Sequence, residues 1–349
     1  MANLTYHEQK DIENIKRLRQ LIKELPPFCA DFFRGIEPRT STRTRIAYAY
    51  DLRIFFDFLK RENSYVASLG DNIPLSVLEQ LTVTDLEEYL EYLKCHPSEL
   101  GEDVINTERG IMRKSSSLKS FYNYYYRNER IEKNPAALLL SPKLHEKEIV
   151  RLEIDEVARL LDQVEEGDKL TEKQKIYHER TKVRDLAMMS LFLGTGIRVS
   201  ECVGLNIADV DLDNCGIKIY RKGGKEAVVY FSDEVREVLE KYMEERELIE
   251  PCQGHEDAFF LSMQRKRMNV RSVENLVKKY SKLVTPLKKI TPHKLRSTYG
   301  TSLYRETGDI YLVASVLGHN DVNTTRKHYA AQEDERRRSA RNVVRLREE

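Results

Sequence analysis

The sequence lacks any long run of hydrophobic residues. No apolar stretch approaches the roughly 20 residues that a membrane-spanning helix needs, and the N-terminus has no hydrophobic segment typical of a secretion signal. Five cysteines are scattered over the 349 residues without CxxC spacing. We therefore expect a soluble cytoplasmic protein, not associated with membranes, with reduced thiols and neither a disulfide framework nor a zinc site.

An excess of either charge is also missing. The 58 Lys and Arg residues against 57 Asp and Glu residues leave a net charge of +1, whereas a nucleic-acid-binding protein usually has a clear basic excess. Basic runs such as residues 264–271 and 336–341 are balanced by acidic ones such as residues 233–250. Each run taken singly is most simply a solvated helix face, so charge alone identifies no partner.

Several catalytic motifs are absent. The sequence has no HExxH, Walker A loop or GxSxG motif, and no group of carboxylates suited to two metal ions. A phosphoryl-transfer enzyme built from the remaining residues would work without a metal. It would need arginines to neutralise the phosphate oxygens, a general acid and base, and a side-chain nucleophile.

Helical periodicity dominates the first part of the chain. Residues 8–25, 40–62, 82–95 and 109–131 have apolar side chains at helical spacing; Pro26 and Pro27 end the first helix, and Thr84 is the expected cap of the third. Residues 141–149 form a basic stretch, bounded by Pro142 near its start, that is typical of a linker. We expect residues 1–145 to form an all-helical domain with an extra N-terminal helix.

The pattern changes after this linker. Residues 152–166 and 183–196 are helical in spacing, and residues 214–231 contain two β-rich arms around Gly223 and Gly224, which predict a hairpin. Helical patterns then return. The predicted fold class is therefore mainly α, with residues 146–349 forming an α-rich domain that carries a small antiparallel sheet.

Two segments offer groups that suit a phosphate. Arg198 follows a glycine turn in GTGIRVSE at a predicted helix start, where free N–H groups and the helix dipole favour anions. In ITPHKLRST, Thr291 and Pro292 suit the cap and first position of a helix that carries His293 and Arg296 on one face. Taken alone, a surface salt bridge explains the first segment more simply, and HxxR is a short pattern.

The predicted hairpin ends in two lysines. Lys222 closes its first arm and Lys225 opens its second, so the tip could reach into a groove, where a lysine can donate a proton to a leaving oxygen. A pair of solubilising turn lysines is the alternative.

Six residues in chain order resemble the signature of the tyrosine recombinase (phage integrase) family: Arg198 in GTGIRVSE, Lys222 in RKGGK, His293 and Arg296 in TPHKLR, His319 in LGH, and Tyr329. The resemblance spans nearly the whole chain and is strongest to the Xer branch. The segments RKGGK, DAFFL, SVENLVKKYS and TPHKLR are similar to XerS-type single recombinases. The N-terminal helices resemble the core-binding domain of the family, and residues 146–349 its catalytic domain.

The resemblance implies a site-specific recombinase that cleaves and rejoins DNA through a 3′-phosphotyrosyl intermediate, with no metal, ATP or other cofactor. The implied roles are clamping of the scissile phosphate by Arg198 and Arg296, proton transfer by His293, protonation of the 5′ leaving oxygen by Lys222, hydrogen bonding to the transition state by His319, and nucleophilic attack by Tyr329.

The sequence departs from the family pattern at two points. Ser297 follows Arg296, where the family often has a second histidine. Tyr329 is the tenth residue after His319, whereas the family usually places the tyrosine ninth, which here is His328. Either the loop has one extra residue or the match is locally shifted; we keep Tyr329 because a histidine nucleophile fits this chemistry poorly.

Double-stranded DNA is the implied partner. We expect the N-terminal helices to contact its phosphates through residues near two helix starts, and the hairpin to add one contact. The candidates are Arg43, Thr44, Arg45, Lys114, Ser117, Lys119 and, on the hairpin, Lys225. Recombination would need four protomers on two duplexes. Residues 334–349 predict a short amphipathic helix that docks on a neighbouring protomer or folds back on its own domain.

The biological role stays open between alternatives. Xer-type resolution of chromosome dimers is the first; integration of a mobile element uses the same chemistry. A non-catalytic DNA-binding relative and a type-IB-like topoisomerase are further alternatives. The sequence does not specify which DNA site is recognised.

Overall fold

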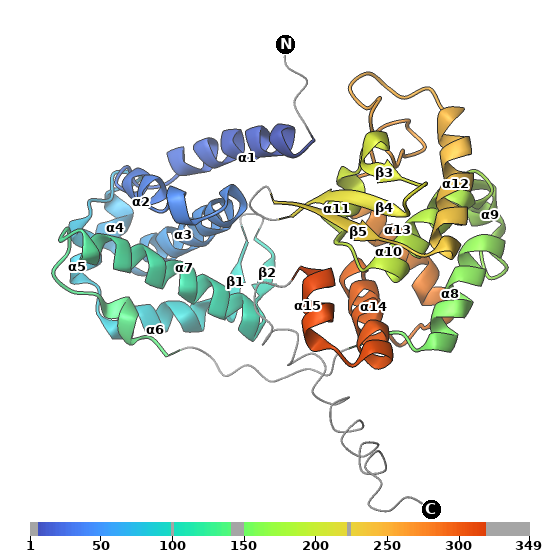
Figure 1. The fold of residues 1–349 in the computed structure, drawn as a ribbon. Coiled ribbons are helices and arrows are strands. Elements are labelled where there is room, and N and C mark those ends of the chain that lie inside the picture. Colours follow the sequence, from blue (N-terminus) through green and yellow to red (C-terminus); the bar gives the residue numbers. More distant parts are fainter. Residues whose placement is uncertain (1–5, 99–100, 141–149, 222–224, 319–349) are drawn as a thin grey trace, which may run out of the picture. The chain divides into compact units, whose positions relative to one another are not determined.

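A computed structural model describes residues 6–98, 101–140, 150–221 and 225–318, and the chain divides into two compact units, residues 1–147 and 148–349 (Figure 1). The described residues are mostly helical and include two small antiparallel sheets, so the predicted mainly α fold class is confirmed. All five cysteines lie in the described ranges, and none of them forms a disulfide there. Within these ranges, every helix is too short or too polar to span a membrane.

Three long helices form the frame of the first unit, called unit 1 below. α1 (Tyr6–Lys23) packs on α3 (Thr42–Glu62), and α3 packs on α7 (Glu108–Arg127). Side-chain caps start two of them: Ser41 accepts from the amide of Thr44, and Thr107 from that of Gly110. The shorter elements are α2 (Cys29–Gly35), η1 (Glu37–Arg39), α4 (Ser64–Ser68), α5 (Ser76–Gln80), α6 (Val83–Tyr92) and η2 (Pro135–Leu138).

Aromatic side chains fill the core of unit 1. Phe121 of α7 is completely buried, and its ring meets those of Phe32 and Tyr125 edge-on, with centroids 5.1 and 5.2 Å apart. The Tyr125 hydroxyl donates a 2.6 Å hydrogen bond to the carbonyl of Phe28. Edge-to-face packing is the preferred geometry for such rings, and here it holds α7 against the segment that carries α2.

Two expectations for unit 1 were wrong. The unit is not all-helical, because β1 (Cys95–Pro97) pairs antiparallel with β2 (Asp103–Ile105); strands of three residues are too short to show an alternating pattern. The cap of α6 is Thr82 rather than Thr84. The amide of Asp85 donates to the Thr82 hydroxyl, and the Asp85 carboxylate accepts from the Thr82 amide at 2.6 Å, a reciprocal capping box.

The second unit, unit 2, is built around α10 (Lys182–Thr195). This helix packs against α8 (Ile154–Glu166), α12 (Asp233–Glu247) and α14 (Pro292–Thr307). Its completely buried apolar side chains are Ala187, Met188, Met189, Leu191 and Phe192. The remaining helices are α9 (Glu172–His178), α11 (Val199–Gly204), η3 (Ile207–Asp209), α13 (Val270–Val284) and α15 (Ile310–Leu317).

A three-stranded antiparallel sheet completes unit 2, in the order β3 (Val210–Asp211), β4 (Gly216–Tyr220) and β5 (Glu226–Tyr230). Both arms of the predicted hairpin are confirmed. Tyr220 pairs with Glu226, and one step further the Arg221 amide donates to the Lys225 carbonyl at 2.8 Å. The three residues between Arg221 and Lys225 lie outside the described ranges.

Candidate active site

A glycine turn joins α10 to α11. α10 ends at Gly196, whose φ is +63°, and a Cβ atom there would lie 2.5 Å from the Tyr299 ring and 2.9 Å from Leu317. Both the left-handed backbone and the close packing require glycine at this position. The turn places Arg198 at the N-cap of α11, as predicted from GTGIRVSE.

Glu201 orients Arg198. The Arg198 amide donates to Oε2 of Glu201, and its guanidinium donates to Oε1, both at 2.8 Å. A second guanidinium nitrogen donates to the Gly318 carbonyl at 3.2 Å. The Glu201 side chain is only 3% exposed but that of Arg198 is 40% exposed, so a buried carboxylate holds a guanidinium that solvent and ligands can still reach. Glu201 is not among the predicted site residues, although a glutamate three residues after a helix cap supplies one half of a capping box.

Arg296 reaches the same place from α14. Pro292 occupies the first turn of α14 and Thr291 its N-cap position, as predicted, although the Thr291 side chain makes no capping hydrogen bond. Arg296 is 6% exposed, and its guanidinium donates to the Gly196 carbonyl at 2.5 Å and to the Leu317 carbonyl. His293, three residues earlier, is exposed.

The C-terminal carbonyls of α15 gather three arginines. The last carbonyls of a helix lack intrahelical partners and carry partial negative charge, so they attract cations. Here four consecutive carbonyls accept from guanidinium groups of three distant segments: Ser315 and Val316 from Arg221 at 3.5 and 2.8 Å, Leu317 from Arg296, and Gly318 from Arg198. The chain enters the LGH motif at this point.

The structure thus brings Arg198 and Arg296 together. Lys225 is exposed at the base of the hairpin. Lys222, His319 and Tyr329 lie outside the described residues, as do the expected linker 141–149 and the tail 334–349. In the part of the chain that is described, no group of three or more His, Cys, Asp or Glu side chains is placed to hold a metal ion.

The DNA-contact candidates of unit 1 differ in exposure. Arg43 is exposed at the start of α3, and Thr44 beside it is half-buried. Four others are engaged or buried inside the unit: Arg45 pairs with Glu37 at 2.9 Å, Lys114 donates to Asn106 at 2.7 Å, Lys119 donates to the Leu139 carbonyl at 2.7 Å, and Ser117 is completely buried. Burial lowers the pKa of the Lys114 ammonium.

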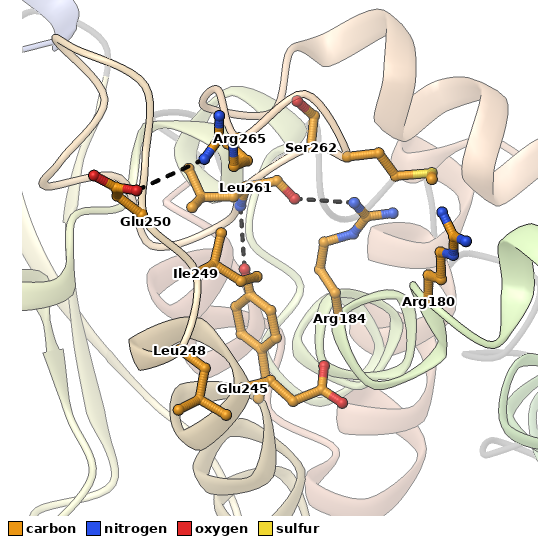
Figure 2. A pocket seen from close by; sticks show the side chains of 11 residues that line it. Arg180, Arg184, Glu245, Leu248, Ile249, Glu250, Leu261, Ser262 and Arg265 are labelled. Carbon is orange, nitrogen blue, oxygen red and sulfur yellow. Dashed lines mark hydrogen bonds and ion pairs between the residues drawn. The ribbon is translucent and has the colours of Figure 1, made fainter.

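A separate hollow of about 480 Å³ lies elsewhere in unit 2 (Figure 2). Arg184 donates to the Leu261 carbonyl at 2.9 Å, and the Leu261 amide donates to the Tyr242 hydroxyl at 3.1 Å. Leu248 and Met263 line it and are exposed. None of the predicted site residues lines this hollow.

Comparisons with known proteins agree on one family. The phage integrase family matches residues 150–336, a range that includes all six predicted catalytic positions. Among curated proteins, the tyrosine recombinase XerC of Caldanaerobacter subterraneus is 35% identical over 318 residues, covering 86% of this chain and 82% of the relative. The tyrosine recombinase XerS of Streptococcus pyogenes is 31% identical over 345 residues, covering 91% and 96%.

Solved structures share the fold at lower identity. The Tn1549 transposon integrase in complex with circular intermediate DNA has a TM-score of 0.62 at 21% identity, covering 86% of this chain and 94% of that one. The XerH site-specific recombinase bound to its palindromic difH substrate has a TM-score of 0.60 at 19% identity, covering 82% and 75%.

Proposed function

The chain belongs to the phage integrase family and is a tyrosine recombinase, an enzyme that cleaves and rejoins DNA, and from this premise we propose that the six residues of the predicted signature form its active site. The observation that carries the proposal is the convergence of Arg198 and Arg296 on the adjacent carbonyls of Gly318 and Leu317. Two guanidinium groups at one point suit the two non-bridging oxygens of a single phosphate.

Cleavage exchanges one phosphate ester bond for another and transfers two protons. The phenol oxygen of Tyr329 attacks the phosphorus, its proton passes to His293, and the bond from phosphorus to the 5′ oxygen breaks. The 5′ oxygen leaves with a proton from the Lys222 ammonium. His319 hydrogen-bonds the phosphoryl group in the transition state. The 3′-phosphotyrosyl ester conserves the energy of the broken bond, so attack by a 5′ hydroxyl reverses every transfer without ATP.

Arg198 is the more available of the two clamping groups. Its guanidinium is held by Glu201 and one carbonyl and is 40% exposed, whereas Arg296 is buried on two carbonyls. A phosphate is a charged acceptor and binds guanidinium roughly twice as strongly as a neutral carbonyl does. The phosphate therefore displaces the Gly318 carbonyl from Arg198 first, while Arg296 keeps the Gly196 turn in place.

DNA binding by unit 1 rests on Arg43 in this proposal, because its charged side chain is the exposed one among the six candidates there. A plot of log affinity against log salt concentration has a negative slope. In the Arg43→Ala variant this slope should become less steep by about 1, the effect of one lost phosphate contact. Ser117→Ala is the control, since Ser117 is buried. Equal slopes for Arg43→Ala and the unmodified protein would remove Arg43 from the interface.

The proposed biological role is resolution of chromosome dimers in the cytoplasm, by four protomers on two duplexes with residues 334–349 docked between neighbours. The XerC and XerS relatives support this choice over integration of a mobile element, because the match covers more than four-fifths of the length of each. A deletion strain should accumulate chromosome dimers. Normal chromosome segregation in that strain would favour the mobile-element alternative. The number of protomers bound to two paired duplexes is measured separately, by sedimentation.

A trapping assay tests the chemistry. The substrate is a labelled duplex that carries the recombination site and a nick beside the scissile phosphate, so that the short fragment released by cleavage diffuses away. It is incubated with the protein in EDTA, which removes metal ions. A covalent protein–DNA adduct should appear on a denaturing gel, survive in His328→Ala and disappear in Tyr329→Phe. An adduct that persists in Tyr329→Phe and is lost in His328→Ala would assign the nucleophile to the ninth position, and a metal requirement would contradict the mechanism.

A further inference from the structure

We propose that Arg221, which is not one of the six signature residues, is a positioning residue for the reaction: it ties the end of the hairpin arm, directly before Lys222 in the chain, to the last turn of α15. The inference rests on the proposed role of Lys222 as general acid. Arg221 directly precedes Lys222 in the chain, as Gly318 directly precedes His319.

Arg221 directly follows β4, and its backbone is bonded to the opposite arm of the hairpin. Ile217 and Ile219 of β4 are buried, so packing holds the body of the strand. Beyond Tyr220 no apolar side chain continues this anchorage among the described residues. The Arg221 amide instead donates to the Lys225 carbonyl at 2.8 Å, which adds one rung to the ladder at the base of the predicted tip.

The side chain of Arg221 supplies the second anchor. Its guanidinium donates to the Val316 carbonyl at 2.8 Å and, over a longer 3.5 Å, to the Ser315 carbonyl. It also lies against Gly318, because a Cβ atom at this glycine, whose φ is +61°, would collide with it. A planar guanidinium fits two neighbouring carbonyls, and the negative end of the helix dipole favours its charge.

α15 is a firm support that does not itself depend on Arg221. Val313 and Leu317 are buried in a small apolar cluster with Tyr304 of α14. The carbonyls of the next two positions are held separately, by Arg296 and Arg198. Loss of the Arg221 guanidinium therefore frees the hairpin end while α15 stays anchored, so the defect should fall on Lys222 and spare His319.

A DNA substrate with sulfur in place of the bridging 5′ oxygen tests whether Arg221 acts by positioning the general acid or by supporting the structure of the site in general. A thiolate leaves without a proton, since thiols have a pKa on the order of 8.5, so cleavage of this substrate does not need the general acid. On the oxygen substrate, we expect Arg221→Ala to slow single-turnover cleavage about 10–100-fold, the usual effect of a small misplacement of a reacting group. On the sulfur substrate it should cleave at nearly the rate of the unmodified protein.

Three further variants calibrate the measurement. Lys222→Ala should show the same rescue by sulfur, with a larger loss on oxygen. Arg221→Lys keeps the charge but not the fork, and should lie between Arg221→Ala and the unmodified protein. Lys218→Ala removes a positive charge from the same strand, where Lys218 pairs with Glu226 at 2.9 Å and has no part in the α15 contact, and should cleave both substrates normally.

The outcomes separate the two proposals. Rescue of Lys222→Ala without rescue of Arg221→Ala overturns the inference alone, because Arg221 would then act on something other than proton donation. If sulfur rescues neither variant, the assignment of Lys222 as general acid fails, and the inference fails with it. A melting temperature for Arg221→Ala equal to that of Lys218→Ala shows that the cleavage defect is not a folding defect.

Discussion

Arg198 and Glu201 are joined twice within the first turn of α11, by the backbone amide and by the guanidinium of Arg198, each at 2.8 Å from a different carboxylate oxygen. Glu201 is almost completely buried, so its carboxylate has little freedom to move. The ion pair with this carboxylate therefore restricts the orientation of the partly exposed Arg198 guanidinium. We infer that Glu201 holds the Arg198 guanidinium in the orientation that its proposed phosphate contact needs.

Replacing Glu201 should therefore impair cleavage more than stability. Glu201→Gln keeps an acceptor for the Arg198 amide but removes the charge that orients the guanidinium. We expect single-turnover cleavage to fall about 10-fold or more, as for other losses of orientation at a reacting centre. The exposed pair of Glu172 with Lys175 provides the control, since Glu172→Gln should leave cleavage unchanged. Normal cleavage by Glu201→Gln would refute the orienting role.

Lysine substitutions should distinguish the two arginines. In the proposed active site, either Arg198→Lys or Arg296→Lys removes a forked donor from the phosphate, so each should slow cleavage about 10²–10³-fold. Only Arg296→Lys should also destabilise unit 2, by about 1–3 kcal/mol, because a buried lysine cannot serve both the Gly196 and the Leu317 carbonyls. Hydrogen exchange of α10 amides measures this difference, and equal protection in the two variants would contradict it.

Two glycines with similar backbones should respond differently to alanine. Gly196 and Gly254 have φ values of +63° and +83°, so alanine at either costs about 1–2 kcal/mol of backbone strain. At Gly254 nothing lies within 4 Å of the added Cβ, whereas at Gly196 it meets Tyr299 and Leu317. Gly196→Ala should therefore lower the free energy of unfolding further than Gly254→Ala and also impair cleavage. Equal effects in denaturation experiments would show that the packing around Gly196 adjusts freely.

Asp51 should make unit 1 less stable as the pH rises. Burial outweighs the adjacent Arg113 and raises the pKa of Asp51 from 3.8 to about 6. A carboxyl with a raised pKa in the folded state stabilises that state below pH 3.8, and this contribution is lost as the pH rises through 6. The loss is at most about 3 kcal/mol, from roughly two pKa units.

Hydrogen exchange of α3 amides at pH 5 and pH 7, corrected for intrinsic rates, measures this effect. Protection should be weaker at pH 7 in the unmodified protein and nearly independent of pH in Asp51→Asn. An Asp51→Asn variant with an unchanged pH dependence would assign the effect to another group.

The charge balance shows where composition misleads. A net charge of +1 argued mildly against a DNA enzyme, yet the chain belongs to a family that acts on DNA. Many of its charges cancel locally, as in the exposed pairs Arg159–Asp155 and Lys182–Glu179. Net charge sums such pairs together with the groups that face a ligand, so it says little about any one surface.

The features that can be predicted from the amino-acid sequence alone are local. The helix stop at Gly196, the proline in the first turn of α14 and the two arms of the hairpin follow from the conformational preferences of a few consecutive residues. The order of the six signature residues likewise identifies the family without any structure. Where preferences of neighbours compete, as at Thr82 and Thr84, only the reciprocal bond with Asp85 selected the cap.

Which side chains meet depends on how the helices pack. Arg198, Arg221 and Arg296 come from three distant segments, and the packing of α14 and α15 on their neighbours brings all three to successive carbonyls. Lys114 and Ser117 are likewise buried where α7 packs on other elements of unit 1. Such contacts join residues far apart in the chain, and no periodicity or motif encodes them, because they arise only when separate helices pack together.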